Sequence, residues 1–259
     1  MPFIKFKDVT LHYHLTGGGS VPIVFLNSLG TDFRIWDNVI ARLDVNPAIL
    51  TIDKRGHGLS DDGTITMDLL VNDVADLMDH LGLSGALVCG VSVGGMIAQG
   101  LASQRPDLVS GLMLCNTGAK IGDEEGWNAR IDAVNEGGIS SIADTILERW
   151  FSTRFRMSQA DEFAGYRNML TRTPASGYAG VSAAIRDANL TDGTAKLRLP
   201  TICIAGSEDM ATPPDLVHSL SNLISGSTYE LIDGVGHLPC IEVPQTVAEH
   251  IKNLHARLT

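Results

Sequence analysis

The chain has 259 residues, of which 44% are hydrophobic and 19% are charged. This composition predicts a globular protein with one large core, or a core domain with an inserted lid. The formal net charge of −11 argues against nucleic acid as a partner, because binding to phosphates requires a basic surface.

Membrane association and disulfide bonding are also disfavoured by the sequence. No apolar run approaches the roughly 20 residues that span a bilayer, and the first residues lack the apolar region of a signal peptide. The four cysteines have no CxxC spacing, and Cys89, Cys115 and Cys203 lie inside apolar runs. We therefore expect a cytoplasmic protein with reduced, structural thiols and no membrane partner.

Short runs of strand-forming residues alternate with helix-like patterns along the chain. In chain order, strands are expected at Ile4–Lys7, Leu11–Leu15, Pro22–Asn27, Ala48–Asp53, Ala86–Val91, Gly111–Cys115, Pro200–Ala205 and Thr228–Ile232. The first two runs are expected to form a hairpin. Strand, helix and strand repeated in this way predict an eight-stranded, mostly parallel sheet flanked by helices.

The clearest helical pattern lies between the fourth and fifth predicted strands. Leu70, Val74 and Leu77 share one face with other apolar residues at a period of 3.6. The aspartates of this segment are expected on the opposite, solvent-exposed face; they are Asp73, Asp76 and Asp79.

The alternation of strands and helices lapses after Asn116. Residues 118–197 have a mainly helical pattern, with breaks at Gly137-Gly138 and Thr173-Pro174. We therefore expect a core formed by residues 1–117 and 198–259, with 118–197 inserted as a helical cap. Residues 118–199 hold 10 of the 19 Lys and Arg residues. These residues form either solvated helix faces or a surface that faces an anionic ligand.

A serine bracketed by glycines lies between the fifth predicted strand and a helix-like segment. The pentapeptide Gly90-Val91-Ser92-Val93-Gly94 follows the pattern G-x-S-x-G. Small neighbours allow strand and helix to approach closely around a strained serine, as a nucleophile elbow requires. The alternative interpretation is a plain glycine-rich turn, because so short a pattern is often matched by chance.

Two later loops carry the residue types with which such a serine would act. Gly206 to Pro214, with Glu208 and Asp209, follows the seventh predicted strand, and Gly234 to Pro239, with His237, follows the eighth. Both loops come at the carboxyl ends of strands, where parallel sheets build their sites. The order serine, acid, histidine is one in which catalytic triads occur.

These motifs resemble those of the α/β-hydrolase family, and the resemblance covers nearly the whole chain. The segment Asp53-Lys54-Arg55-Gly56-His57-Gly58-Leu59-Ser60 also resembles the D-x-R-G-x-G-x-S loop of that family. The resemblance implies an α/β-hydrolase fold with an inserted helical cap. Some members place the acid after the sixth strand, but that position here reads Cys115-Asn116-Thr117, which has no carboxylate.

The resemblance also implies a role for each matching residue. Ser92 would be the nucleophile, His237 the general base and Asp209 the acid that orients it, with the adjacent Glu208 as its rival. The backbone N–H groups of Leu29 and Val93 would form the oxyanion hole.

The remaining histidines do not predict a metal site. His57 is interpreted as a turn residue of the D-x-R-G-x-G loop. The pairs His12/His14 and His250/His255 lack the HExxH pattern or cysteine partners. We therefore expect neither a metal nor a cofactor. Cys240 could line the pocket beside His237, but the serine already occupies the nucleophile's position.

Two further stretches resemble a narrower group within the family, the 3-oxoadipate enol-lactonases of the β-ketoadipate pathway. They are FLNSLGTDFRIWD, residues 25–37, and CNTGAKIGDEEGWNARI, residues 115–131. The resemblance implies that the substrate is a small anionic lactone. Arg130 and Trp127, with Arg34 behind them, are the candidates for binding its carboxylate.

Several other functions use the same motifs and stay open at this point. A general carboxylesterase or a cofactor-free perhydrolase would act on neutral esters or small acids. A C–C bond hydrolase would act on another product of ring cleavage. A receptor on a hydrolase scaffold would bind a lactone without catalysis. The sequence also leaves open whether the chain forms a homo-oligomer.

Overall fold

An eight-stranded sheet lies at the centre of the computed structural model, which describes residues 2–43 and 47–259. The strand order is β1-β2-β4-β3-β5-β6-β7-β8. The strands are β1 (Phe3–Phe6), β2 (Val9–Thr16), β3 (Ile23–Leu26), β4 (Ile49–Ile52), β5 (Ala86–Val91), β6 (Val109–Cys115), β7 (Thr201–Gly206) and β8 (Thr228–Ile232). β2 pairs antiparallel with β1 and β4, and the other neighbours are parallel. The predicted eight-stranded, mostly parallel sheet is confirmed.

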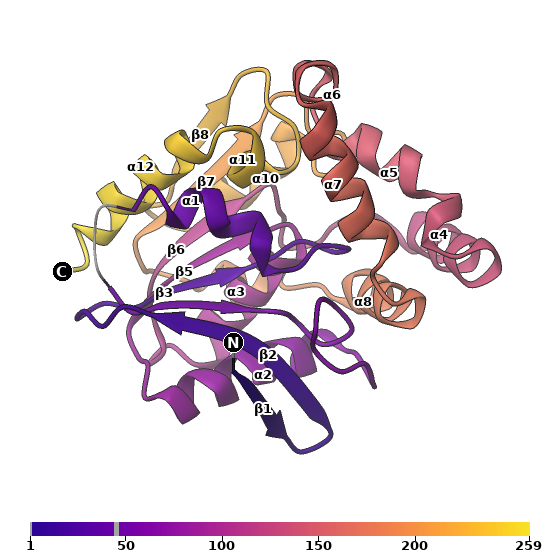
Figure 1. Cartoon of the computed structure of the whole chain (residues 1–259). Helices are drawn as coiled ribbons and strands as arrows, with labels where there is room; N and C mark the ends of the chain where they lie inside the picture. The colour runs from indigo at the N-terminus through magenta and orange to yellow at the C-terminus, as the bar shows by residue number, and fades with distance from the viewer. Residues whose placement is uncertain (1, 44–46) are drawn as a thin grey trace.

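Helices cover both faces of this sheet (Figure 1). On one side α1 (Asp37–Ile40) packs against α12 (Pro244–His255), and on the other α2 (Met67–Leu81) packs against α3 (Val93–Gln104). β3, β4 and β5 are buried along their whole length. Strands covered on both faces read as continuous apolar runs, which is why the sequence identifies them.

Helix α2 confirms the helical pattern but corrects the placement of one aspartate. The side chain of Thr66 accepts a hydrogen bond from the Leu69 N–H at its start. Asp73 follows Leu70 by three positions and therefore lies on the apolar face. It is only 6% exposed and accepts bonds of 2.6 Å from Nε and Nη2 of Arg55. The expectation that Asp73 faces solvent was wrong, because the Arg55 guanidinium compensates its burial.

The segment between β6 and β7 is helical, and we refer to residues 118–197 as the cap segment. Its helices are α4 (Glu124–Gly137), η2 (Ile139–Ser141), α5 (Ala143–Trp150), α6 (Thr153–Ser158), α7 (Ala160–Thr171), α8 (Ala175–Asp187) and α9 (Thr191–Thr194). Several of them lie together at one end of the sheet (Figure 1). That this segment forms a separate domain stays a prediction.

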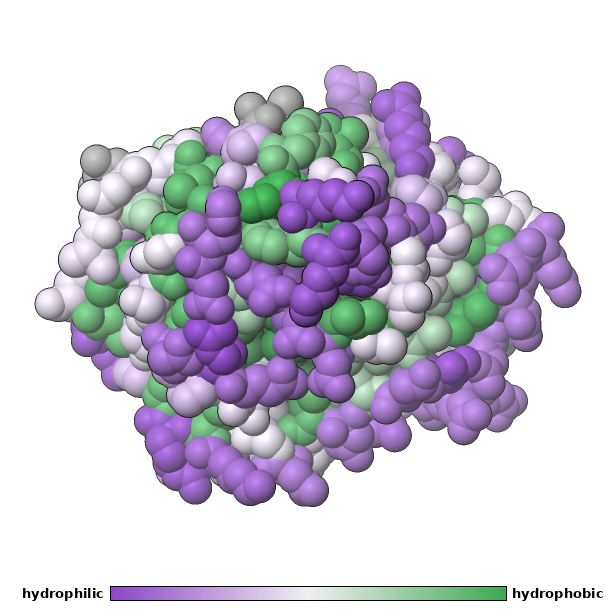
Figure 2. Space-filling view, turned by 90° about the horizontal axis from the view of Figure 1, so that it is seen from below, coloured by the Kyte–Doolittle hydropathy of each residue, from purple (hydrophilic) through white to green (hydrophobic). Residues whose placement is uncertain are grey.

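The surface and the cysteines agree with the composition. Hydrophilic side chains are spread over the face that Figure 2 shows, with apolar residues scattered between them. In the part of the chain that the structure describes, no helix is both long and apolar enough to cross a membrane. All four cysteines are buried and unpaired, and burial raises the pKa of the Cys89 and Cys240 thiols well above the usual range.

The rest of the chain completes the two layers of helices. The elements not yet described are η1 (Phe33–Trp36), α10 (Pro214–Leu223) and α11 (Pro239–Glu242). Helix η1 begins just after the loop that follows β3, and α10 and α11 follow the loops after β7 and β8. The segments predicted to carry function therefore all leave the carboxyl ends of parallel strands.

Candidate active site

Ser92 lies on a strained turn between β5 and α3. Its backbone has φ 58° and ψ −123°, a conformation that a residue with a side chain rarely adopts. A Cβ atom at Gly90 would collide with the backbone of Gly94, and one at Gly94 would collide with the carbonyl of Leu26. The flanking glycines are thus required by close backbone approach, and the turn has the geometry of a nucleophile elbow.

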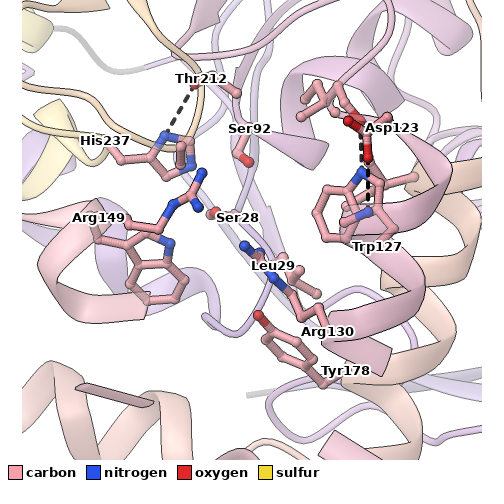
Figure 3. Close-up of a pocket in the computed structure, with 16 residues that line it drawn as sticks. Ser28, Leu29, Ser92, Asp123, Trp127, Arg130, Arg149, Tyr178, Thr212 and His237 are labelled. Carbon is pink, nitrogen blue, oxygen red and sulfur yellow. Dashed lines mark hydrogen bonds between the residues drawn. The ribbon is translucent and has the colours of Figure 1, made fainter. Parts of the chain in front are cut away.

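Asp209 and His237 meet across the loops after β7 and β8. The Oδ2 atom of Asp209 lies 2.9 Å from Nδ1 of His237, and both residues are buried. Oδ1 accepts the backbone N–H groups of Ala211 at 2.7 Å and Thr212 at 3.0 Å. The Thr212 hydroxyl donates to Oδ2 at 2.6 Å and lies 3.2 Å from Nδ1 of His237 (Figure 3). These bonds hold the carboxylate against the imidazole.

Glu208, the rival acid, points elsewhere. Its Oε2 atom accepts the backbone N–H of Thr153, at the start of α6, at 3.0 Å. It makes no hydrogen bond to His237 in the described chain. The geometry therefore favours Asp209 as the acid that orients the histidine.

Asn116 links the three loops of this site, a role that the sequence pattern did not indicate. It has a positive φ of 47° directly after β6. Its amide nitrogen donates to the carbonyl of Gly236 at 2.8 Å, and its amide oxygen accepts the Gly206 N–H at 3.1 Å. An amide both donates and accepts, so Asn116 can fix the loops after β7 and β8 together.

Glu242 anchors the histidine loop to the cap segment. Its carboxylate accepts the backbone N–H of Gly236 at 3.1 Å and that of Ser152 at 3.0 Å. Burial raises the pKa of Glu242, while the hydrogen bonds from Ser152 and Gly236 oppose this shift. The carboxylate thereby ties the base loop to the junction of α5 and α6.

The loop after β3 presents backbone donors beside Ser92. Leu29 and Ser92 line the same pocket. The N–H groups of Leu29 and Val93 donate no hydrogen bond to another residue of ranges 2–43 and 47–259. Two such donors beside the nucleophile could bind the oxyanion of a tetrahedral intermediate.

The D-x-R-G-x-G-x-S segment forms a scaffold under this loop. Asp53 accepts the N–H groups of Phe33 and Leu59, each at 3.0 Å, and contacts Nδ1 of His12 at 2.8 Å. Nε2 of His57 accepts the N–H of Gly30 at 2.9 Å. Burial lowers the pKa of His57 well below its usual value, as the neighbouring Lys54 also does. His57 therefore remains a neutral acceptor that positions the loop.

A cavity of about 250 Å³ opens in front of Ser92 and His237. The cap segment supplies much of its wall, including Trp127, Arg130 and Arg149, whose side chains extend into the same space as Ser92 (Figure 3). Asp123 caps the start of α4 by accepting the Gly126 N–H at 2.8 Å. This cap fixes where α4 begins and hence where its residues meet the cavity.

Two guanidinium groups at this cavity have no carboxylate partner within the described residues. Cζ of Arg130 lies 4.8 Å from the ring centroid of Trp127, which supports it by a cation–π contact. Arg149 donates from Nη2 to the carbonyl of Met210 at 2.8 Å, but its buried Nε atom has no partner. Burial lowers the pKa of Arg149, and the nearby charge of Arg130 adds to this effect.

The structure assigns different places to the predicted substrate-binding residues. Trp127 and Arg130 line the cavity, although the indole N–H of Trp127 already donates to the carbonyl of Ile121 at 2.7 Å. Arg34 is not among the lining residues; its side chain is 64% exposed and pairs with Asp32 at 2.6 Å. The prediction for Arg34 is therefore not supported. Cys240 is buried outside the cavity wall.

Arg149 was not among the residues predicted from the sequence, because no motif surrounds it. The only signal was the excess of basic residues in the cap segment, and this signal does not select one position. A metal site is not indicated, since no group of three or more His, Cys, Asp or Glu in the described ranges could hold a metal ion.

Comparisons with known proteins agree with this geometry. The chain is 34% identical over 254 residues to 3-oxoadipate enol-lactonase 2 of Acinetobacter baylyi, covering 95% of each chain. It is 36% identical over 239 residues to 3-oxoadipate enol-lactonase 1 of the same organism, covering 91% of this chain and 89% of the relative. The crystal structure of the enol-lactonase from Burkholderia xenovorans LB400 superposes with a TM-score of 0.95 at 32% identity, covering 98% of this chain and 100% of that one.

A family model described as the alpha/beta hydrolase fold matches residues 21–244. This range contains the serine turn, the acid loop and the histidine loop. The chain therefore belongs to the α/β hydrolase family.

Proposed function

We propose that this protein is a carboxylic ester hydrolase that opens an anionic enol-lactone, 3-oxoadipate enol-lactone, to give 3-oxoadipate. The observation that carries the proposal is that Arg130 and Arg149, which line the cavity together with Ser92 and His237, have no carboxylate partner among the described residues. Relatives named enol-lactonases, at 34% and 36% identity, support a lactone hydrolase role.

In the proposed reaction, Ser92 attacks the carbonyl carbon of the lactone ring. His237 takes the proton from the serine hydroxyl, and Asp209 stabilises the resulting imidazolium. The N–H groups of Leu29 and Val93 donate to the oxyanion. The ring C–O bond then breaks, and the ring oxygen leaves as an enolate.

The enolate makes ring opening favourable without a strong acid catalyst. It is far more stable than an alkoxide, and it becomes a ketone when its carbon receives the proton that His237 took from Ser92, directly or through water. Water, activated by His237, then attacks the acyl group on Ser92 and releases 3-oxoadipate. The cycle needs no metal or cofactor, because each proton is carried by His237 or by water.

The carboxylate of the substrate is expected to lie between the lactone ring and the cap segment. Arg130 and Arg149 supply charged N–H donors there, and a bidentate arginine bond fixes both position and orientation. Trp127 holds the Arg130 guanidinium by stacking and is not itself the donor.

The alternative functions make less use of these groups. A carboxylesterase or perhydrolase acting on neutral substrates leaves both guanidinium groups without a ligand. A C–C bond hydrolase acting on a larger ring-cleavage product needs a larger space than about 250 Å³. A receptor without turnover needs no Asp209–His237 pair. The cytoplasmic location and any homo-oligomer stay predictions.

The test is an assay of the purified protein with 3-oxoadipate enol-lactone, followed by the loss of enol-ester absorbance, beside p-nitrophenyl acetate. We expect rapid loss of the lactone and a strong preference for it over the neutral ester. Turnover of p-nitrophenyl acetate alone would contradict the substrate assignment and leave a general esterase.

A further inference from the structure

Lys54 is a buried lysine below the loop that follows β3. Its side chain is 5% exposed, and its ammonium nitrogen donates to the carbonyl of Ser28 at 2.5 Å and to that of Thr31 at 3.3 Å. No carboxylate lies within ion-pair distance of it in the part of the chain that the structure describes. The charge of Lys54 is thus directed at backbone carbonyl groups.

This placement is unfavourable for a charged group. Burial lowers the pKa of Lys54 to about 7, against the raising effect of Asp53 and Asp32. An apolar side chain of similar length would fill the same space without that penalty. The amine is therefore explained better by the carbonyl groups that it binds than by packing.

The carbonyl of Ser28 and the N–H of Leu29 belong to one peptide group. In a trans peptide the two bonds point in opposite directions within one plane, so a donor on the oxygen fixes where the N–H points. A cation on the oxygen also polarises the peptide and strengthens its N–H as a donor. Two uncharged donors of Thr31 also bond the Ser28 carbonyl oxygen, the hydroxyl Oγ1 at 2.9 Å and the backbone N–H at 3.4 Å.

The neighbouring groups of the loop are held in other ways. Nε2 of His57 accepts the Gly30 N–H at 2.9 Å, and the side chain of Asn27 donates to the carbonyl of Thr31. These bonds restrain the flanks of the Ser28–Leu29 peptide. Among the described residues, Lys54 is the only charged side chain that donates a hydrogen bond to the Ser28–Leu29 peptide.

We propose that Lys54 is a positioning residue for the oxyanion hole: its ammonium group orients and polarises the Ser28–Leu29 peptide so that the Leu29 N–H binds the developing oxyanion. The inference rests on the oxyanion role proposed above for Leu29. Lys54 acts through the peptide and does not touch the substrate. Its effect is therefore on turnover, with little effect on ground-state binding.

The first test compares Lys54→Met with the wild-type protein on p-nitrophenyl acetate. Met fills the space but donates nothing. We expect kcat to fall about 10- to 100-fold, less than the loss of a direct oxyanion donor, with KM within about twofold. Lys5→Met, an exposed change on β1, is the matched control and should leave both constants unchanged.

A second measurement separates this role from a merely structural one. A trifluoromethyl ketone forms a tetrahedral adduct with Ser92, and its oxyanion would occupy the hole. Its affinity should fall in Lys54→Met by about the same factor as kcat/KM. A folded variant with kcat within twofold of wild type, or with adduct affinity unchanged, would overturn the proposal.

The pH dependence gives a third test. The charged and titratable groups that act on Lys54 are Asp53, Asp32 and His57. The ratio of wild-type to Lys54→Met kcat cancels titrations that the two proteins share. The proposal predicts that this ratio is largest near pH 6 and declines above about pH 7 as the ammonium loses its proton. A ratio independent of pH from 6 to 9 would contradict it.

If Lys54→Met does not fold, Lys54→Gln, which keeps a neutral donor, is measured in its place and should also lower kcat. The neutral activated ester keeps these tests independent of the lactone assignment. If Ser92→Ala retained the esterase activity, the proposed function itself would fail. Ser92-dependent activity that is unaffected by the changes at Lys54 would overturn only the role of Lys54.

Discussion

The carboxyl edge of the sheet and the cap segment build the same cavity in different ways. At the sheet edge, polar groups are held by the fold: Asp209 accepts three further hydrogen bonds besides its contact with His237. In the cap segment, the cavity wall carries charges that the described chain does not neutralise: Arg130 and Arg149 pair with no carboxylate, and the buried Nε atom of Arg149 has no hydrogen-bond partner. Buried polar atoms are rarely left without partners, so those at a cavity wall point to a ligand.

The difference separates the chemistry from the choice of substrate. A rigid sheet edge can perform the same acyl transfer on many esters, whereas the cap segment decides which ester fits. Changes at the sheet edge should therefore lower turnover of every substrate. Changes in the cap segment should discriminate between charged and neutral substrates.

The largest expected effect is that of Ser92→Ala. Removing the nucleophile should lower kcat by about 10⁴-fold or more on both the lactone and p-nitrophenyl acetate. Thermal unfolding monitors the fold, which alanine at this strained position should preserve. A folded variant with near-normal activity on either ester would show that Ser92 is not the nucleophile.

The second prediction uses two adjacent carboxylates as a matched pair. Asp209→Asn should lower kcat by about 10²- to 10⁴-fold, because the amide no longer stabilises the imidazolium that forms on His237. Glu208→Gln should change kcat by less than about tenfold, since Glu208 bonds the Thr153 N–H instead. Steady-state kinetics on both esters decide the matter, and the reverse ranking would reassign the acid.

The third prediction concerns the cap segment. Arg130→Met and Arg149→Met should each raise KM for the anionic lactone by about 10- to 100-fold, the range expected for losing a hydrogen bond to a charged group. The constants for p-nitrophenyl acetate should change little. Arg34→Met is the matched control, because Arg34 is exposed and paired with Asp32. Equal losses on both esters would mean that these arginines serve the fold.

The last prediction concerns stability, a different quantity from turnover. Burial lowers the pKa of Lys54 from 10.5 to about 7. Between these values the unfolded chain binds more protons than the folded chain, so the free energy of unfolding rises with pH across this window. Lys54→Met lacks this rise. Its stability relative to wild type should be highest at or below pH 7 and decline toward pH 10, as measured by urea denaturation; a difference that does not vary with pH would contradict the buried charge.

Local rules predicted the sheet and the turn at Ser92, whereas Asp209 and His237 were indicated by the resemblance to the α/β-hydrolase family. Gly90 and Gly94 are needed wherever strand and helix backbones approach closely, and the loops after β7 and β8 follow strands with continuous apolar runs. The resemblance selected Asp209 over its rival Glu208, although both follow the same strand. The bond from Asp209 to His237 favours the same choice.

Other residues could not be predicted because their partners are distant in sequence. Asn116 bonds Gly206 and Gly236, which are 90 and 120 residues away. The sequence pattern predicts that Asp73 is exposed, whereas its burial is explained by the ion pair with Arg55, which is distant in sequence. The roles of Arg149 and Lys54 depend on where the ends of their long side chains lie in the fold. Arg149 reaches the cavity and Lys54 reaches the loop after β3, and sequence spacing predicts neither position.

The most direct test of the central claim is a comparison of the enol-lactone acid with its methyl ester, in which a methyl group replaces the negative charge of the side carboxylate. The kcat/KM of each is measured with wild type and with the Arg130→Met/Arg149→Met double variant. The account predicts at least about a tenfold preference for the anion in wild type, and none in the double variant. Equal use of both compounds by wild type, or a preference that survives in the double variant, would contradict it.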